Sequence, residues 1–135
     1  MHEHPIQTPE EALKFILGGN ARFTLRSVAT GVRYTYRVRS SKDGRVYFVR
    51  LLTNDGHYTY LGMLKNGRFT LTEKSKTKDS PPIRAFTWTY DHLLRDQLLP
   101  SLEIWHDGHC GRCGRSLTVP ASIASGFGPE CITKL

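Results

Sequence analysis

Long apolar runs are missing from this chain of 135 residues. A helix that crosses a membrane needs about 18 or more consecutive apolar residues, so we expect no membrane-spanning segment. The N-terminal stretch contains glutamates and has no basic region ahead of its short apolar segment, so we expect no secretory signal. Cysteine is also scarce, and the few thiols fit a reducing compartment. The sequence therefore predicts a cytoplasmic protein.

The three cysteines of the chain are Cys110, Cys113 and Cys131. Three thiols cannot all pair with one another, and a C-x2-C spacing lets two sulfurs face one tetrahedral ion, so we predict a structural Zn²⁺ site. Tetrahedral coordination requires a fourth ligand, and two histidines lie nearby. His106 stands at an H-x3-C spacing and is the preferred ligand, because His109 adjoins Cys110 and neighbouring side chains diverge in most backbone conformations. The choice between the two histidines stays open at this point.

The cysteines have other interpretations. A C-x2-C pair can be redox-active, but that chemistry is typical of a βαβ context with an apolar or proline-containing dipeptide, where this chain has Gly111-Arg112. The thiols can also be ordinary cysteines. A catalytic metal would need an open coordination position and a general base, and Asp107 is a carboxylate beside the predicted ligands.

The segment from Cys110 to Cys131 has the form CxxCGRxLTxPxSIxxGxGPxC and resembles the C-terminal module of a family of small uncharacterised proteins from bacteriophages and bacteria. The pattern is carried by Cys110, Cys113, Gly114, Arg115, Leu117, Thr118, Pro120, Ser122, Ile123, Gly126, Gly128, Pro129 and Cys131. Upstream stretches resemble the longer phage members, so the likeness covers most of the chain: Gly19–Leu25, Thr35–Val38 and Tyr58–Gly62. The resemblance implies a metal-binding tail on a phage-type protein, located in a bacterial host cell. It implies no activity, because the family is a domain of unknown function.

Positive charge is concentrated in the middle of the chain. Residues 22–78 contain 13 Lys or Arg against three Asp or Glu, while the remainder has 6 basic and 9 acidic residues. The net charge of +7 therefore comes entirely from the central stretch. Such a region favours an anionic partner, either nucleic acid or an acidic protein surface.

In the same region, residues 22–26 and 32–39 alternate apolar and polar side chains with a period of two, which predicts β-strands, while residues 46–52 are apolar at every position except Arg50, as expected for a central strand covered on both faces. The predicted strands cover residues 22–26, 32–39, 46–52, 58–64 and 68–72. Five consecutive strands predict an antiparallel meander, and a strong hairpin signal at Asn66-Gly67 supports it. The alternation places Tyr34, Tyr36 and Tyr60 on the core side.

Helices are predicted before and after these strands. Thr8-Pro9-Glu10-Glu11 combines a capping box with a proline at the first helical position. Ser80-Pro81-Pro82 opens a second helix, whose apolar stripe ends at Leu98. A short strand at 102–105 and a brief helical turn at 119–126 are expected beside the cysteines.

The predicted fold class is therefore α+β. An antiparallel five-stranded meander or small open barrel is flanked by two helices and followed by a C-terminal zinc-knuckle module. The predicted domains are a basic sheet domain at 1–100 and a zinc-binding module at 101–135.

Arginines on the polar side of the predicted sheet are the candidate nucleic-acid-binding residues: Arg22, Arg26, Arg33, Arg37 and Arg39. Clustered arginines attract phosphates through counterion release, and aromatic rings add stacking with single strands. Trp88 and Trp105 lie off the apolar stripes and are the better stacking candidates. The opposing interpretation is a solvated polar face, which antiparallel sheets commonly present to water.

Familiar catalytic motifs are absent: the sequence has no nucleophile elbow, phosphate-binding glycine loop or HExxH. We therefore expect neither an enzyme nor a small-molecule substrate. Two functions compete, with different partners. One is a zinc-containing accessory protein of phage type that binds DNA or RNA. The other is an effector or inhibitor of anti-defence type that binds a host or phage protein through the same basic surface. The target would not be a protein groove that holds nucleic acid, because such a groove is itself basic and would repel this surface.

Overall fold

The computed structural model describes residues 4–72, 74–75 and 80–135. These residues form one antiparallel sheet with the strand order β1-β7-β2-β3-β4-β5-β6. The strands are β1 (His4–Ile6), β2 (Asn20–Ser27), β3 (Arg33–Ser40), β4 (Val46–Leu52), β5 (Tyr58–Lys65), β6 (Arg68–Thr70) and β7 (Leu102–His106). The helices of this part of the chain are α1 (Pro9–Ile16), α2 (Pro81–Leu94), α3 (Pro120–Ser125) and a 3₁₀ turn (Cys131–Lys134). Within the described ranges, no helix is long and apolar enough to span a membrane.

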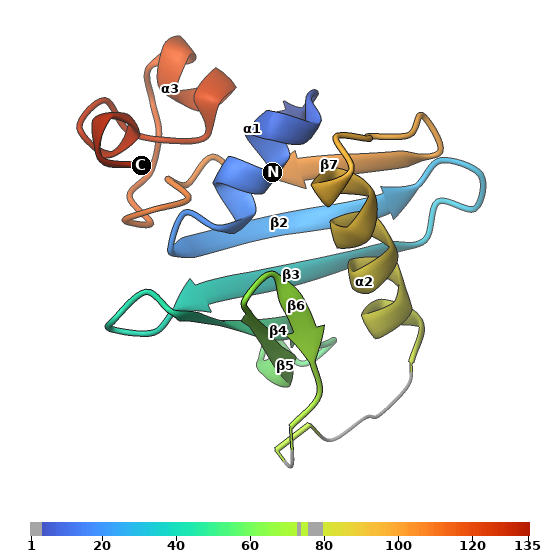
Figure 1. Ribbon diagram of the computed structural model, residues 1–135. Helices are drawn as coiled ribbons and strands as arrows, with labels where there is room; N and C mark the ends of the chain where they lie inside the picture. The colour runs from blue at the N-terminus through green and yellow to red at the C-terminus, as the bar shows by residue number, and fades with distance from the viewer. Residues whose placement is uncertain (1–3, 73, 76–79) are drawn as a thin grey trace.

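The predicted meander is confirmed for β2 to β6, which pair in sequence order. The sheet is open, because β1 and β6 lie at its opposite edges (Figure 1). The predicted number of five strands is wrong, since β7 and β1 extend the sheet beyond β2. Periodicity carries no information about the long-range pairing of β7 with β2, and β1 has three residues, too few to show a period.

The position of β7 also affects how the chain divides between the sheet and the C-terminal module. It lies between β1 and β2, so residues 102–106 belong to the sheet and not to the C-terminal module in which the division at residue 101 placed them. We call residues 107–135 the cysteine module.

The helices begin and end for local reasons. The backbone N–H of Glu11 donates to Oγ1 of Thr8 at 3.2 Å and caps α1, as its sequence signal predicts. α2 ends at Leu94 and not at the predicted Leu98, because Asp96 adopts a left-handed backbone conformation with a φ of 58°.

α1 and α2 cover the same face of the sheet, and the core lies beneath them (Figure 1). At its centre, the ring of Phe86 lies against four other rings, with centroids 5.5 to 6.4 Å away: Phe23, Tyr36, Phe69 and Tyr90. Burial of each such side chain contributes about 1.5 to 3 kcal/mol. The hydroxyl of Tyr36 donates to the carbonyl of Pro82 at 2.6 Å, which joins β3 to the start of α2.

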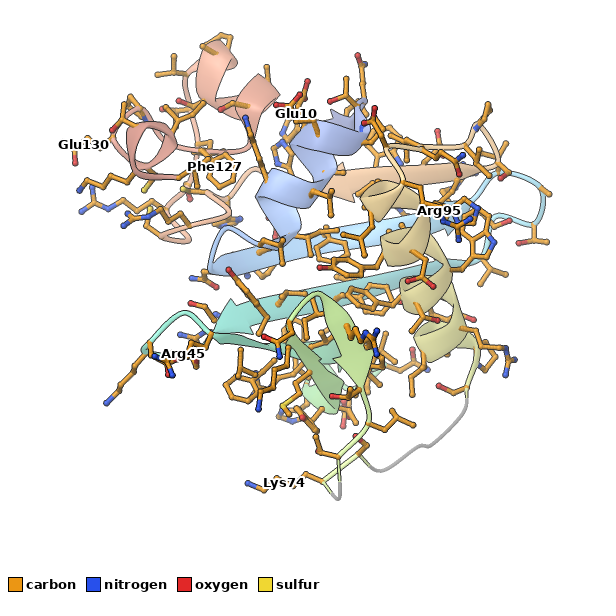
Figure 2. The ribbon with its side chains drawn as sticks, in the orientation of Figure 1. Glu10, Arg45, Lys74, Arg95, Phe127 and Glu130 are labelled. Carbon is orange, nitrogen blue, oxygen red and sulfur yellow. The ribbon has the colours of Figure 1, made fainter. Side chains whose placement is uncertain are left out.

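The cysteine module packs against the end of α1. The ring of Phe127 points toward α1 (Figure 2) and its centroid lies 5.9 Å from that of Phe15. Gly18 follows α1, and a Cβ at this position would lie 2.6 Å from the carbonyl oxygen of Gly111. Only glycine therefore permits this close approach between α1 and the module.

Candidate functional site

The cysteine module brings the sulfur atoms of Cys110, Cys113 and Cys131 within 4.8 Å of one another. The first two lie in a tight turn, in which the Gly114 N–H donates to the Cys110 carbonyl at 2.9 Å. Gly114 has a φ of 81°, a conformation that favours glycine. Cys131 begins the 3₁₀ turn near the end of the chain and reaches the same point from the other side.

Backbone amides surround the sulfur of Cys110. The N–H groups of Arg112, Cys113 and Gly128 donate to it at 3.4, 3.5 and 3.4 Å. Burial alone would raise the pKa of the Cys110 thiol, but these hydrogen bonds outweigh burial and lower the pKa to about 7. Because the thiolate is the form that ligates metals, the turn prepares Cys110 as a ligand.

The other sulfurs complete a donor set that suits a metal ion. Burial raises the pKa of Cys131, while Nη1 of Arg112 donates to its sulfur at 3.7 Å. Deprotonation of all three thiols would place three negative charges side by side, and a single guanidinium would not neutralise them. A divalent or soft monovalent cation would, and thiolates select ions such as Zn²⁺ and Cu⁺. The three cysteines can therefore hold a metal.

His106, the preferred fourth ligand, lies elsewhere, and this corrects the predicted ligand set. Among the described residues, the metal-ligating atoms that lie together are the three sulfurs alone. Nε2 of His106 donates to the carbonyl of Ile123 at 2.7 Å, and Nδ1 accepts from the Gly108 N–H at 3.1 Å. Both ring nitrogens are thus engaged by backbone. The buried ring stacks on Phe15 at 5.4 Å, so His106 fastens β7 to the module.

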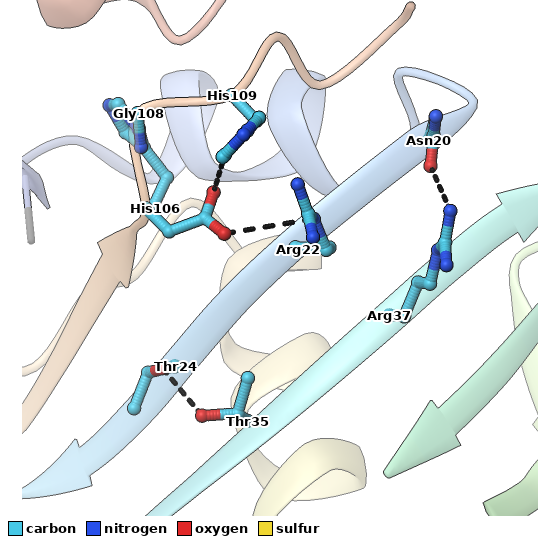
Figure 3. Close-up of polar contacts among 9 residues, drawn as sticks. Asn20, Arg22, Thr24, Thr35, Arg37, His106, Gly108 and His109 are labelled. Atoms are coloured by element: carbon cyan, nitrogen blue, oxygen red, sulfur yellow. Dashed lines mark hydrogen bonds and ion pairs between the residues drawn. The ribbon is translucent and has the colours of Figure 1, made fainter. Parts of the chain in front are cut away.

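His109 also points away from the sulfurs. Its Nδ1 lies 3.1 Å from Oδ1 of Asp107, whose Oδ2 lies 3.6 Å from Nε of Arg22 on β2 (Figure 3). Asp107, the candidate general base for a catalytic metal, is therefore held between two cationic or polar side chains. This chain of contacts links the module to the sheet.

A second constellation lies on the face of the sheet opposite α1 and α2. Directly paired residues share one face, and strand register places Arg22 opposite Arg37 and Arg37 opposite Arg50. These three residues, which we call the arginine row, cross β2, β3 and β4. Arg50 was missing from the sequence-based set, because the rest of its strand is apolar and predicted a central strand covered on both faces; the register instead places Arg50 on the uncovered face. The basic face, as used below, comprises Arg22, Arg26, Arg33, Arg37, Arg39 and Arg50.

The predicted arginines differ in their surroundings. Arg26 is paired with Glu103 at 2.6 Å and lies opposite Arg33 at the far end of β2. In the described part of the chain, no carboxylate lies within ion-pair distance of Arg37, Arg39 or Arg50.

Arg37 is the most constrained member of the row. Its Nη2 donates to Oδ1 of Asn20 at 3.3 Å (Figure 3), whereas its buried Nε has no hydrogen-bond partner among the described residues. Burial lowers the pKa of Arg37, and the charges of Arg39, Arg22 and Arg50 lower it further. Like charges placed directly opposite each other are destabilising, so the row is maintained against a cost.

Aromatic rings share the basic face. Tyr60 pairs with Arg50 and therefore lies on this side, which corrects its predicted position in the core. The register shifts between Val49 and Arg50, and Leu61 is the extra residue that turns Tyr60 outward. Gly62, inside the strand, is the one sequence signal for such a bulge. The other rings on the face are those of Phe48, Tyr58 and Trp105.

Trp88, the other stacking candidate, lies apart from the basic face. It belongs to α2 on the covered side of the sheet, and its ring contacts that of His92 with centroids 4.0 Å apart. The structure thus separates the two tryptophans.

Comparison with known protein families gives a match at the C-terminal end of the chain. Residues 106–135 match a family of unknown function, DUF6011. No curated protein and no solved structure matches the chain. The matched segment coincides with the cysteine module together with His106, so an uncharacterised domain of recognised sequence pattern carries the three sulfurs.

Proposed function

We propose that this chain is an accessory protein of phage type that binds nucleic acid through its basic face and holds a structural zinc ion in its cysteine module. The observation that carries the proposal is the arginine row, in which two of three arginines lack a carboxylate partner among the described residues. A solvated polar face does not require a row of arginines. The like charges of the arginine row oppose folding. A polyanion removes that repulsion.

Phosphates suit this surface for a second reason. Adjacent strands lie about 4.8 Å apart, so the arginine row spans about 10 Å, a length over which two or three phosphates of one chain can lie. Each neutralised phosphate releases counterions, which makes binding strongly dependent on salt. The row thus favours a ligand with closely spaced, repeated negative charges.

Zinc has a structural part in this proposal. Cys110, Cys113 and Cys131 would hold the ion, and a water molecule or a group outside the cluster would provide the fourth ligand. The ion supplies the positive charge that keeps three thiolates together. No catalytic step is assigned to it, because the one carboxylate considered as a base, Asp107, is engaged by Arg22 and His109.

Salt-dependent fluorescence anisotropy with a labelled oligonucleotide tests the proposal. The double variant Arg37→Gln/Arg50→Gln removes two charges from the arginine row, and Arg45→Gln/Arg95→Gln removes two charges elsewhere (Figure 2). The first variant is expected to weaken binding and to reduce the log–log salt slope by about 0.7 to 0.9 for each lost phosphate contact. The second should leave the slope unchanged. Equal loss in both variants, or no binding by the wild type at low salt, contradicts the proposal.

A further inference from the structure

We infer that the ligand of the basic face is single-stranded nucleic acid, with the arginine row contacting phosphates and Trp105 stacking on a base. This inference rests on the proposed function and narrows it to one class of nucleic acid. Three observations carry it: the width of the sheet, the rings interleaved with the arginines, and unpartnered donors on the same face.

The sheet is too wide for the grooves of a duplex. The five strands that carry the basic face and its rings, β7 and β2 to β5, span about 19 Å along the sheet at about 4.8 Å spacing, whereas the major groove of B-DNA is about 12 Å wide and admits a helix or a two-stranded ribbon. The basic face lies on the broad side of the sheet, with no helix projecting from it in the described part of the chain. A single strand imposes no such limit, because it can lie across the strands.

The rings lie beside the arginines. The guanidinium carbon of Arg37 lies 5.8 Å from the ring centroid of Tyr58, and that of Arg50 lies 5.9 Å from that of Phe48. These cation–π contacts hold arginines and rings at similar height above the sheet. Backbone charge and base stacking are the two components of sequence-tolerant single-strand binding, and both are present here.

Trp105 is partly exposed and has short side chains beside it along the sheet. It pairs with Thr24, and Thr24 pairs with Thr35. The two threonine hydroxyls are hydrogen-bonded at 2.8 Å (Figure 3), so these short side chains are occupied with each other and do not rise to cover the indole. This row lies one side-chain repeat, about 6.8 Å, from the arginine row. A nucleotide can therefore place its base on Trp105 while its phosphate meets Arg22 or Arg37.

Two buried donors on this face lack acceptors among the described residues: Nε of Arg37 and Nε1 of Trp105. Buried donors are almost always paired, so each such group needs an explanation. Phosphate, sugar and base oxygens are acceptors, and a small turn of either side chain would present its donor to them. Carboxylates of an acidic protein would also accept from Arg37, so an acidic polymer is included in the test below.

Trp105 provides a direct spectroscopic test, because Trp88→Phe leaves it as the single tryptophan of the chain. In this background, we expect an oligothymidylate of about 12 nucleotides to quench the fluorescence and to bind at least tenfold more tightly than a duplex of the same length. The RNA equivalent is expected to behave in the same way. Trp105→Leu should weaken single-strand binding by about tenfold, and Trp88→Leu should not. Circular dichroism checks that both variants keep the fold.

The outcomes separate this inference from the proposed function. Equal affinity for single strand and duplex, with no effect of Trp105→Leu, overturns the inference and leaves nucleic-acid binding in place. Failure of both probes to bind overturns both. Polyglutamate that binds as tightly as the oligonucleotide and competes with it also overturns the inference, because it assigns the face to acidic protein.

Discussion

The cysteine module and the basic face are assembled over very different lengths of chain. All three sulfurs come from residues 110–131, and the turn that holds Cys110 closes within a few residues. The arginine row takes one residue from each of three strands and depends on their register. We therefore expect the module to depend on the proposed metal ion, whereas the face depends on the core beneath the sheet. We expect each to survive most damage to the other.

Loss of a metal ligand is expected to have the largest effect, and to affect the cysteine module while the sheet stays folded. Cys131→Ser removes one of three thiolates, and structural zinc contributes on the order of 10 kcal/mol of apparent binding free energy to small modules. We expect the purified variant to lose its zinc and residues 107–135 to lose amide protection, while β2 to β5 stay protected. Elemental analysis and hydrogen exchange measure these effects.

Thr118→Ser, an exposed substitution in the same module, is the matched control and should retain zinc. A wild-type protein without stoichiometric metal, or a collapse of the whole sheet in Cys131→Ser, would contradict this division of the molecule.

Substitution of His106 is expected to have the next largest effect, and it tests whether this side chain binds the metal or only packs in the core. His106→Ala removes a buried ring and two hydrogen bonds, so we expect a loss of about 3 kcal/mol in the free energy of unfolding with the zinc content unchanged. His109→Ala, on a half-exposed side chain, should cost less than about 1 kcal/mol. Urea unfolding measures the change in stability, and elemental analysis measures the zinc content. Zinc loss in a folded His106→Ala protein would restore His106 as a ligand.

The same contrast explains which features could be predicted from the sequence. C-x2-C spacing, the Thr8 cap and the meander of β2 to β6 are local patterns, and the structure confirms them. The position of β7 and the outward turn of Tyr60 depend on pairing between distant strands and on one bulge. His106 was wrongly predicted as a metal ligand because its H-x3-C spacing suits one. Its actual partner, the carbonyl of Ile123, lies on α3, 17 residues further along the sequence.

Acid should weaken the junction between the sheet and the module. Burial lowers the pKa of His106, so the unfolded chain binds a proton below about pH 6.5 that the folded protein rejects. Stability from the neutral ring is therefore complete above that pH and is lost as the pH falls toward the lower pKa of the folded state. Urea unfolding of wild type and His106→Gln in excess zinc should show stabilities that differ by a constant amount above about pH 6.5 and converge as the pH falls below it. Parallel curves would mean that His106 titrates normally in the folded protein.

The smallest expected effect concerns the contacts that join the two regions. Asn20 opens β2, and its backbone N–H donates to the Gly111 carbonyl at 2.8 Å while its side-chain oxygen accepts from Arg37. Metal binding in the module is thereby connected to a member of the arginine row. Asn20→Ala keeps the backbone bond and removes the side-chain bond, so we expect affinity for a single-stranded oligonucleotide to fall about threefold.

The contacts of Asn20 predict that zinc binding and oligonucleotide binding affect each other. Such coupling is reciprocal, and it disappears when the shared contact is removed. In the wild type, chelation of zinc should weaken oligonucleotide binding by a similar factor of about three, and bound oligonucleotide should retain zinc more tightly against the chelator. In Asn20→Ala, the remaining coupling runs through the Arg22–Asp107 ion pair, which is partly exposed and therefore weak. Chelation should then change the affinity of Asn20→Ala very little, while Asn54→Ala, in an exposed turn, behaves as wild type. An undiminished effect of chelation in Asn20→Ala would show that the two regions communicate by another route.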